Sequence, residues 1–197
     1  LLSKSLGEKN FKKANDTAAN AAVLYILSYI LFLILGFSVV KPFYLSQIGN
    51  ADVEIMEMGI EYLSTVMIFS FGLFTQFFFE RLLTSTGRTI FSMTSQLTGA
   101  VTNIILDPIL IYGLLGIPEM GVAGAAYATV IGQVVSVLTA IAFHIKFNVE
   151  IKGIIKNLKP SAKIIKEIYM IGLPAIMSSG IYADSSYLCF LLHGDFL

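Results

Sequence analysis

Residues 102–113, "TNIILDPILIYG", place one aspartate in a segment whose other side chains are mostly apolar. An ionisable side chain at membrane depth costs about 3 kcal/mol on insertion scales, so a chain that keeps one usually has a use for it. Between residues 89 and 118 Asp107 is the only charged residue, and a stretch of that length can cross a bilayer as a helix. Asp107 is therefore the first candidate for a functional residue.

The composition of the chain is typical of a membrane protein. Of the 197 residues, 56% are hydrophobic and only 13% are charged, whereas an average soluble domain has about 25% charged residues. The formal net charge is zero, which gives no support to a nucleic-acid partner. Cys189 is the only cysteine, so the chain cannot form an internal disulfide or a paired-cysteine metal site. These features predict an all-α, polytopic membrane helix bundle with the lipid bilayer as its main partner.

Four long apolar stretches are expected to be transmembrane helices, at residues 18–40, 59–79, 90–115 and 121–143. A hydrocarbon core about 30 Å thick needs about 20 helical residues, and each stretch meets that length. Short polar connectors between the stretches predict that successive helices run antiparallel. A fifth apolar stretch begins near residue 164, but Asp184 interrupts it and the residues after that continue a helix poorly.

Basic residues are concentrated in every second connector. The segments 4–13, 81–88 and 146–166 hold 12 of the 13 lysines and arginines, and the other connectors hold only Lys41. Lysine and arginine accumulate on the cytoplasmic side of membrane proteins, which places these three basic segments inside the cell. We therefore expect a multi-pass protein of the cytoplasmic (inner) membrane.

Three polar residues of the third and fourth stretches are expected to lie close together. Asn103 precedes Asp107 by four residues, so both side chains share one face of a helix. At about 1.5 Å of rise per residue, Thr129 of the next helix lies at a depth similar to that of Asp107. Pro108 has no N–H, which leaves the carbonyl of Ile104 without its usual partner. These oxygen atoms suit a Na⁺ ion, or a carboxyl group that exchanges a proton, and we take Asp107, Asn103 and Thr129 as a candidate cation site.

A simpler interpretation is that Asp107 only caps the outer half of a broken helix, with Pro108 in its first turn. That interpretation does not explain the polar and small residues that recur at intervals of three or four along the same face. They are Ser92, Gln96, Gly99, Asn103 and Asp107. A face of this kind either lines a cavity or bonds to neighbouring helices.

The fourth stretch carries two different faces. Small residues recur at every fourth position and predict close packing against another helix. They are Gly124, Ala128, Gly132 and Ser136. Thr129 and Gln133 form a separate polar pair, and we expect Gln133 and Gln96 to line a cavity that holds the substrate.

The remaining polar residues have more ordinary explanations. Gln76, Glu80 and Arg81 lie near the inner end of the second stretch, where an ion pair at the membrane surface is expected. An integral-membrane enzyme would need clustered nucleophiles, bases or metal ligands. His144 lies at a helix end and His193 in the final segment, and neither has a spaced partner. We therefore expect no enzymatic activity and no cofactor.

The segment at residues 106–133, "LDPILIYGLLGIPEMGVAGAAYATVIGQ", closely resembles the fifth and sixth helices of the multidrug and toxic compound extrusion (MATE) transporters. Three further segments are similar to other parts of that family, in the same order. "LLSKSLGEKNFKKAN" (1–15) resembles the end of the second helix and its loop, "FERLLTSTGRT" (79–89) the end of the fourth, and "IYMIGLPAIMSS" (168–179) the start of the seventh. The resemblance covers roughly residues 1–178.

This resemblance implies a fragment that holds helices three to six of a twelve-helix, two-lobed fold. Residues 1–146 would be the larger part of the amino-terminal lobe, and residues 147–166 the cytoplasmic linker between the lobes. Residues 167–197 would be the truncated start of the carboxy-terminal lobe. The remainder of the same chain would then be a necessary partner, and we expect no transport by the fragment alone.

The resemblance also implies antiport that exports drugs or other organic, often cationic, compounds in exchange for Na⁺ or H⁺. In some members the coupling ion is bound by the Asn and Asp of the fifth helix and a Thr of the "GAAxAT" motif, which fall on Asn103, Asp107 and Thr129. An aspartate of the first helix, which is not among these 197 residues, completes that site. The alternative is a flippase for lipid-linked precursors, of a related fold. A flippase of this kind would need a basic cavity to bind the pyrophosphate group, and the four stretches contain no interior Lys or Arg.

Overall fold

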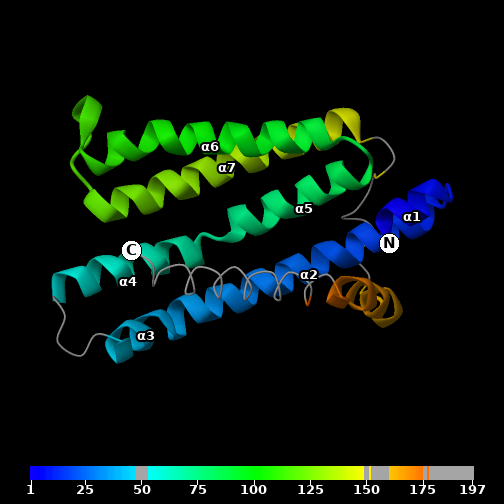
Figure 1. Ribbon diagram of the computed structural model, residues 1–197, viewed down its shortest axis with the longest axis horizontal. Helices are drawn as coiled ribbons and strands as arrows, with labels where there is room; N and C mark the ends of the chain where they lie inside the picture. Colours follow the sequence, from blue (N-terminus) through cyan, green and yellow to red (C-terminus); the bar gives the residue numbers. More distant parts are fainter. Residues whose placement is uncertain (48–52, 149–150, 152–159, 175–176, 178–197) are drawn as a thin grey trace, which may run out of the picture.

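The computed structural model describes residues 1–47, 53–148, 151, 160–174 and 177, and over these residues the fold is all-α. The helices are α1 (Leu2–Gly7), α2 (Phe11–Ser38), α3 (Val40–Gln47), α4 (Val53–Ile68), α5 (Phe71–Ser85), α6 (Thr89–Ile111), the short 3₁₀ helix η1 (Leu114–Gly116) and α7 (Gly121–Phe147). Residues 162–174 are also helical. The predicted all-α bundle is confirmed, and α2, the α4–α5 pair, α6 and α7 alternate in direction (Figure 1).

Two of the described helices, α2 and α7, are long and apolar enough to cross a membrane by themselves. The pair α4 and α5 provides a third span if its two bent halves count as one. Helix α6 has 23 residues, or roughly 35 Å at 1.5 Å per residue, but it is not among the helices whose composition also qualifies them as spans. All four expected stretches therefore correspond to helical segments long enough to span a membrane, if the bent pair α4–α5 counts as one. At most three of the four are also apolar enough to be counted as spans by composition.

A bend of 43° separates α4 from α5, so the expectation of one continuous helix at residues 59–79 is wrong. At the bend the N–H of Ser70 donates to the carbonyl of Met67, three residues earlier, and the Ser70 hydroxyl donates to the same carbonyl at 2.7 Å. Bonding over three residues tightens the backbone locally and changes the direction of the helix axis. No proline is involved, which is why the residue pattern did not reveal the bend.

The bend receives a hydrogen bond from the neighbouring helix. The N–H of Gly72 donates to Phe69 rather than to Ile68, four residues earlier. The carbonyl of Ile68 accepts instead from the hydroxyl of Tyr29 on α2, at 3.2 Å. Because an unpaired backbone carbonyl is costly in an apolar environment, this tertiary bond stabilises the bent conformation.

Helix α6 ends at Ile111, four residues before the end expected at residue 115. Gly113 has a φ of 69°, a left-handed conformation that glycine adopts without a side-chain penalty. The N–H of Met120 then donates to the carbonyl of Leu110 at 3.1 Å and closes the turn into α7. The tight connection keeps α6 and α7 adjacent.

Helices α6 and α7 approach each other closely because their facing residues are small. A Cβ atom placed on Gly99 would lie 2.8 Å from the carbonyl oxygen of Gly132, and one on Gly124 would lie 2.6 Å from that of Leu110. The hydroxyl of Ser136 donates to the carbonyl of Ser95 at 2.8 Å. All four small residues of α7 are buried, which confirms the predicted packing face.

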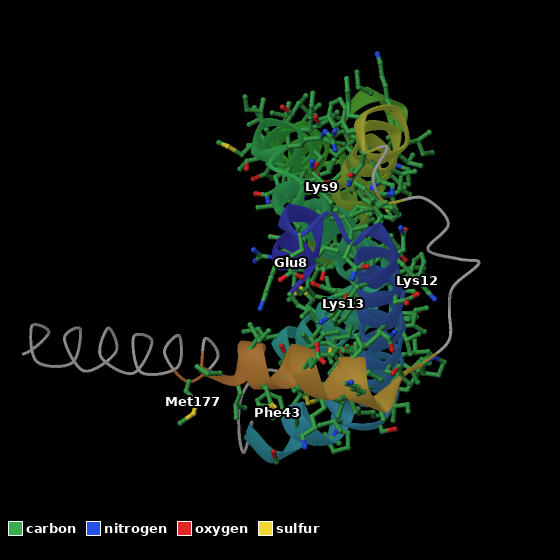
Figure 2. All side chains as sticks on the ribbon, turned by 90° about the vertical axis from the view of Figure 1, so that its right-hand side faces the viewer. Glu8, Lys9, Lys12, Lys13, Phe43 and Met177 are labelled. Atoms are coloured by element: carbon green, nitrogen blue, oxygen red, sulfur yellow. The ribbon has the colours of Figure 1, made fainter. Side chains whose placement is uncertain are left out.

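The described parts of the three basic connectors lie at one end of the bundle, on the right in Figure 1. Arg88 of the α5–α6 turn donates to the side-chain oxygen of Asn148, just after α7, at 3.1 Å. Figure 2 looks onto this end and shows Lys9, Lys12 and Lys13 on it. The arrangement agrees with the alternation of basic connectors in the sequence. Which side of the membrane this end faces stays a prediction.

The helix at residues 162–174 is attached to the basic end of α2. The N–H of Ser161 donates to the side-chain oxygen of Asn20 at 2.7 Å, and Lys13 forms an ion pair with Glu167 at 3.4 Å. This helix carries the start of the expected fifth stretch. Half of the predicted linker (147–166), and residues 178–197 of the predicted carboxy-terminal segment, lie outside the described residues.

Candidate functional site

Helix α6 runs without interruption from Thr89 to Ile111, through both Asp107 and Pro108. Asp107 therefore does not begin a helix, and its interpretation as a simple helix cap is wrong. Pro108 is tolerated because it lies in the last turn, where removal of one backbone hydrogen bond disturbs little of the helix. The carboxylate projects from a continuous helix, on the face that Asn103 shares.

Asn103 connects the three residues predicted to bind a cation. Its amide nitrogen lies 3.4 Å from a carboxylate oxygen of Asp107 and 3.4 Å from the hydroxyl oxygen of Thr129. With the amide turned over, the nitrogen donates to the other Asp107 oxygen at 3.2 Å, and the amide oxygen accepts from the N–H of Thr129 at 3.2 Å. The shorter distances favour the second orientation. In both orientations Asn103 joins α6 to α7.

The same three side chains are neither fully buried nor fully exposed. The hydroxyl of Thr129 donates to the carbonyl of Ala125 at 2.9 Å, so its oxygen lone pairs remain available. The cluster thus contains a carboxylate, an amide oxygen and a hydroxyl oxygen within reach of one another. These hard oxygen donors can coordinate Na⁺, and the carboxylate can alternatively take up a proton.

A polar cavity of about 230 Å³ lies next to this cluster. Its walls come from α5, α6 and α7, and include both glutamines that were predicted to line a cavity, Gln96 and Gln133. The full lining is Gln76, Gln96, Gly99, Ala100, Asn103, Thr129, Gly132 and Gln133. Asp107 does not line the cavity itself and reaches it through Asn103. The polar stripe of α6 therefore does both things left open by the sequence, because it lines a cavity and bonds to neighbouring helices.

The side chain of Gln133, which lines this cavity, has an unsatisfied polar atom that is buried against α5. Its side-chain oxygen is inaccessible to solvent and has no hydrogen-bond partner within the described part of the chain. Gly72 of α5 allows this side chain to fit, because a Cβ atom there would lie 3.2 Å from the Cβ atom of Gln133. A buried acceptor without a donor is costly, so this oxygen lowers the stability of the contact between α5 and α7.

A buried carboxylate that the sequence analysis placed at the surface belongs to the same cavity wall. Glu80 of α5 is only 3% exposed. One of its oxygens accepts from the amide of Gln76 at 2.9 Å, and the other accepts from the amide of Gln96 at 2.8 Å. The expected ion pair between Glu80 and Arg81 is therefore wrong, because Glu80 turns inward while Arg81 is exposed.

The inward position of Glu80 had one signal in the sequence. Gln76 and Glu80 are four residues apart, so they share a helix face, and that face meets the polar stripe of α6 at Gln96. The contact with Gln96 depends on how the turn between α5 and α6 brings the two helices together. Spacing within one helix could not supply that information.

Comparisons with known proteins agree with this architecture. The profile of the MatE family matches residues 1–109. The multidrug export protein MepA of Staphylococcus haemolyticus (strain JCSC1435) is 35% identical over 120 residues, which cover 61% of this chain and 25% of that protein. MepA of Staphylococcus aureus (strain bovine RF122 / ET3-1) is 29% identical over 180 residues, which cover 90% of this chain and 38% of that protein. The chain thus spans well under half the length of these relatives.

Solved structures show the same helix arrangement. The inward-facing structure of a multidrug resistance MATE family transporter of the MOP superfamily superposes with a TM-score of 0.78 at 26% identity, over 88% of this chain and 38% of that one. A MOP superfamily transporter from Pyrococcus furiosus Vc1 (DSM3638) gives a TM-score of 0.77 at 27% identity, over 90% of this chain and 38% of that one. Because the family profile matches more than half of its residues and the helices superpose on MATE transporters, this chain belongs to the MatE family of multi-pass membrane transporters.

Proposed function

We propose that this chain contributes to a multidrug exporter of the cytoplasmic membrane that moves organic, cationic compounds out of the cell in exchange for Na⁺ or H⁺. The observation that carries the proposal is the contact of Asn103 with both Asp107 and Thr129, next to a polar cavity between α5, α6 and α7. The family membership and the named export proteins among the relatives support it. The activity is proposed for a protein of the relatives' length, of which this chain spans 38% in the longer match.

In this proposal Asp107 is the group that holds the coupling cation. A Na⁺ ion would take oxygen atoms from Asp107, Thr129 and Asn103, and the Asn103 amide must then turn its oxygen rather than its nitrogen toward the ion. In the structure described here the nitrogen faces Asp107 and partly offsets its charge. Binding of a cation would therefore replace the amide nitrogen of Asn103 by the cation as the partner of the Asp107 carboxylate. A proton on Asp107 would have the same effect on its charge.

The cavity lined by Gln96 and Gln133 is proposed to form one part of the substrate-binding site. Its volume of about 230 Å³ lies below the roughly 300 Å³ at which pockets begin to enclose drug-sized ligands. The remaining walls of the site are proposed to come from parts of the relatives that this chain does not span. Export then requires alternating access between two lobes, with the ion and the substrate favouring different states.

The residues that line the described cavity give no support to the alternative function, a flippase for lipid-linked precursors. A pyrophosphate group would be bound by lysine or arginine side chains, and none of the residues that line the described cavity is basic. The lining is neutral and polar, and a buried carboxylate supports it from behind. The cavity therefore suits a neutral or cationic compound better than a pyrophosphate.

A sodium-binding experiment tests the cation site directly in a protein of the relatives' length, in which this chain replaces the matching segment of the Staphylococcus aureus MepA and which is purified in lipid nanodiscs. The thermal unfolding midpoint is measured in NaCl and in KCl at equal ionic strength. A ligand present at ten times its dissociation constant stabilises the folded state by about 1.4 kcal/mol, so Na⁺ should raise the midpoint of the wild type. Asp107→Asn should abolish the difference between the two salts, whereas Glu119→Gln, in the exposed loop before α7, should keep it.

Transport is tested in a chimera in which this chain replaces the matching 180-residue segment of the Staphylococcus aureus MepA. Vesicles that contain the chimera should export ethidium when an inward Na⁺ or H⁺ gradient is imposed. Asp107→Asn should uncouple export from that gradient, with Glu119→Gln again as the control. Unchanged coupling in the Asp107 variant would rule out the role proposed for this residue.

A further inference from the structure

Glu80 differs from the other carboxylates of the described helices in having both of its oxygens bonded to side-chain amides inside the bundle. It is 3% exposed, and its partners, Gln76 on α5 and Gln96 on α6, both line the polar cavity. The two bonds are 2.9 Å and 2.8 Å long, as expected for well-formed bonds from nitrogen donors. The carboxylate therefore lies directly behind the cavity wall.

The charge of Glu80 determines which end of each amide faces it. An ionised carboxylate can only accept hydrogen bonds, so the nitrogen of each glutamine must point toward it. The oxygen of each amide is then not bonded to Glu80, and both glutamines line the cavity. Gln76 and Gln96 thus offer hydrogen-bond acceptors to the same space.

We infer that Glu80 is the positioning residue of the polar cavity, and that it makes this cavity selective for ligands that donate hydrogen bonds. By holding Gln76 and Gln96 by their nitrogens, Glu80 keeps the acceptor ends of both amides available to a ligand. Without it, each amide can turn over and present a donor or an acceptor. This inference rests on the proposed function in one respect, namely that the cavity receives the transported compound.

The orientation of the amides can be measured without any transport assay. The chain contains four glutamines, Gln47, Gln76, Gln96 and Gln133, so a glutamine-selective ¹⁵N label gives four side-chain amide signals. In Glu80→Met the signals of Gln76 and Gln96 should move, because both lose a charged acceptor. The signal of Gln47, at the far end of α3, should stay. If Glu80→Met does not fold, Glu80→Gln keeps the shape. It adds a fifth amide signal and should still move at least one of the signals of Gln76 and Gln96.

Selectivity is tested with two cationic probes. Ethidium carries amino groups that donate hydrogen bonds, whereas tetraphenylphosphonium carries a similar charge and no donor. Binding to the purified chain in nanodiscs should favour ethidium, and Glu80→Gln should lower the ratio of the two affinities about tenfold, since hydrogen bonds to misplaced acceptors are lost. Gln96→Leu should lower the same ratio while Glu80 remains, and Glu119→Gln should leave it unchanged.

The outcomes separate this inference from the proposed function. If the amide signals and the affinity ratio are unchanged in Glu80→Gln, the positioning role is wrong, although export can still occur. If the wild type binds neither probe, the proposed substrate site on this chain is wrong, and the amide signals alone decide whether Glu80 positions the glutamines. A general loss of fold in Glu80→Gln would move the signals of all four native glutamines together and would also contradict a specific positioning role.

Discussion

Gly99 of α6 and Gly132 of α7 contact each other through their backbones in both directions. A Cβ atom on Gly99 would lie 2.8 Å from the carbonyl oxygen of Gly132, and one on Gly132 would lie 2.9 Å from the carbonyl oxygen of Gly99. Both glycines also border the polar cavity, and Asn103 lies one turn of α6 beyond Gly99. The close approach of the two helices therefore sets the distance over which Asn103 reaches Thr129.

Alanine at either glycine should push α6 and α7 apart. The obstructing atom is a backbone oxygen, which cannot rotate away, and overpacking of this kind costs about 1–3 kcal/mol. The thermal unfolding midpoint of Gly99→Ala and Gly132→Ala in nanodiscs should fall, and the Na⁺-dependent stabilisation should weaken with it. Gly172→Ala, with no atom within 4 Å of the added carbon, is the matched control and should not lower the midpoint. Equal midpoints for all three variants would contradict the role of the contact.

Tyr29→Phe should destabilise the bend between α4 and α5. The hydroxyl of Tyr29 donates to the freed carbonyl of Ile68, and interhelical hydrogen bonds of this kind contribute about 0.6 kcal/mol, with a maximum near 1.7 kcal/mol. Hydrogen exchange of the backbone amides at residues 69–72 should accelerate in the variant. Tyr112→Phe removes a hydroxyl from a side chain that is 69% exposed and should leave that exchange unchanged.

Asn148→Ala should loosen the basic end of the bundle. Asn148 is 2% exposed, accepts from Arg88 at 3.1 Å and bonds the ring nitrogen of His144 at 3.1 Å. The loss of a buried partner of a charged group should lower the free energy of unfolding by about 1–3 kcal/mol. A double-mutant cycle with Arg88→Gln isolates the pair, and a coupling energy near zero would show that the contact contributes little.

Single cysteines test the orientation predicted from the basic connectors. In a Cys189→Ser background, Lys9→Cys should react with a membrane-impermeant maleimide only in inverted vesicles, because the basic end is expected to face the cytoplasm. Glu119→Cys, in the exposed connection between η1 and α7, should react only in intact cells. Labelling with the opposite pattern would reverse the assigned topology.

The contacts of Asn103 with Asp107 and Thr129 were predictable because their geometry is nearly local. Asn103 and Asp107 lie on one helix at a spacing of four. Thr129 lies on the next helix, after a single tight connection, so counting residues from that connection places it beside them. Glu80 was placed wrongly for the opposite reason. Its proximity to Arg81 in the sequence favoured a surface ion pair, whereas its actual partner Gln96 belongs to another helix.

The sequence by itself determined that this is a membrane protein of the all-α class, and it also determined the approximate helix segments and the family. These properties follow from hydropathy, charge placement and local motifs, each of which acts over about one helix length. Only the tertiary structure decided that α6 passes unbroken through Asp107, that α4 and α5 bend at Ser70, and that Glu80 faces inward. Each of these depends on hydrogen bonds and close contacts within and between neighbouring helices, whose geometry no residue pattern specifies.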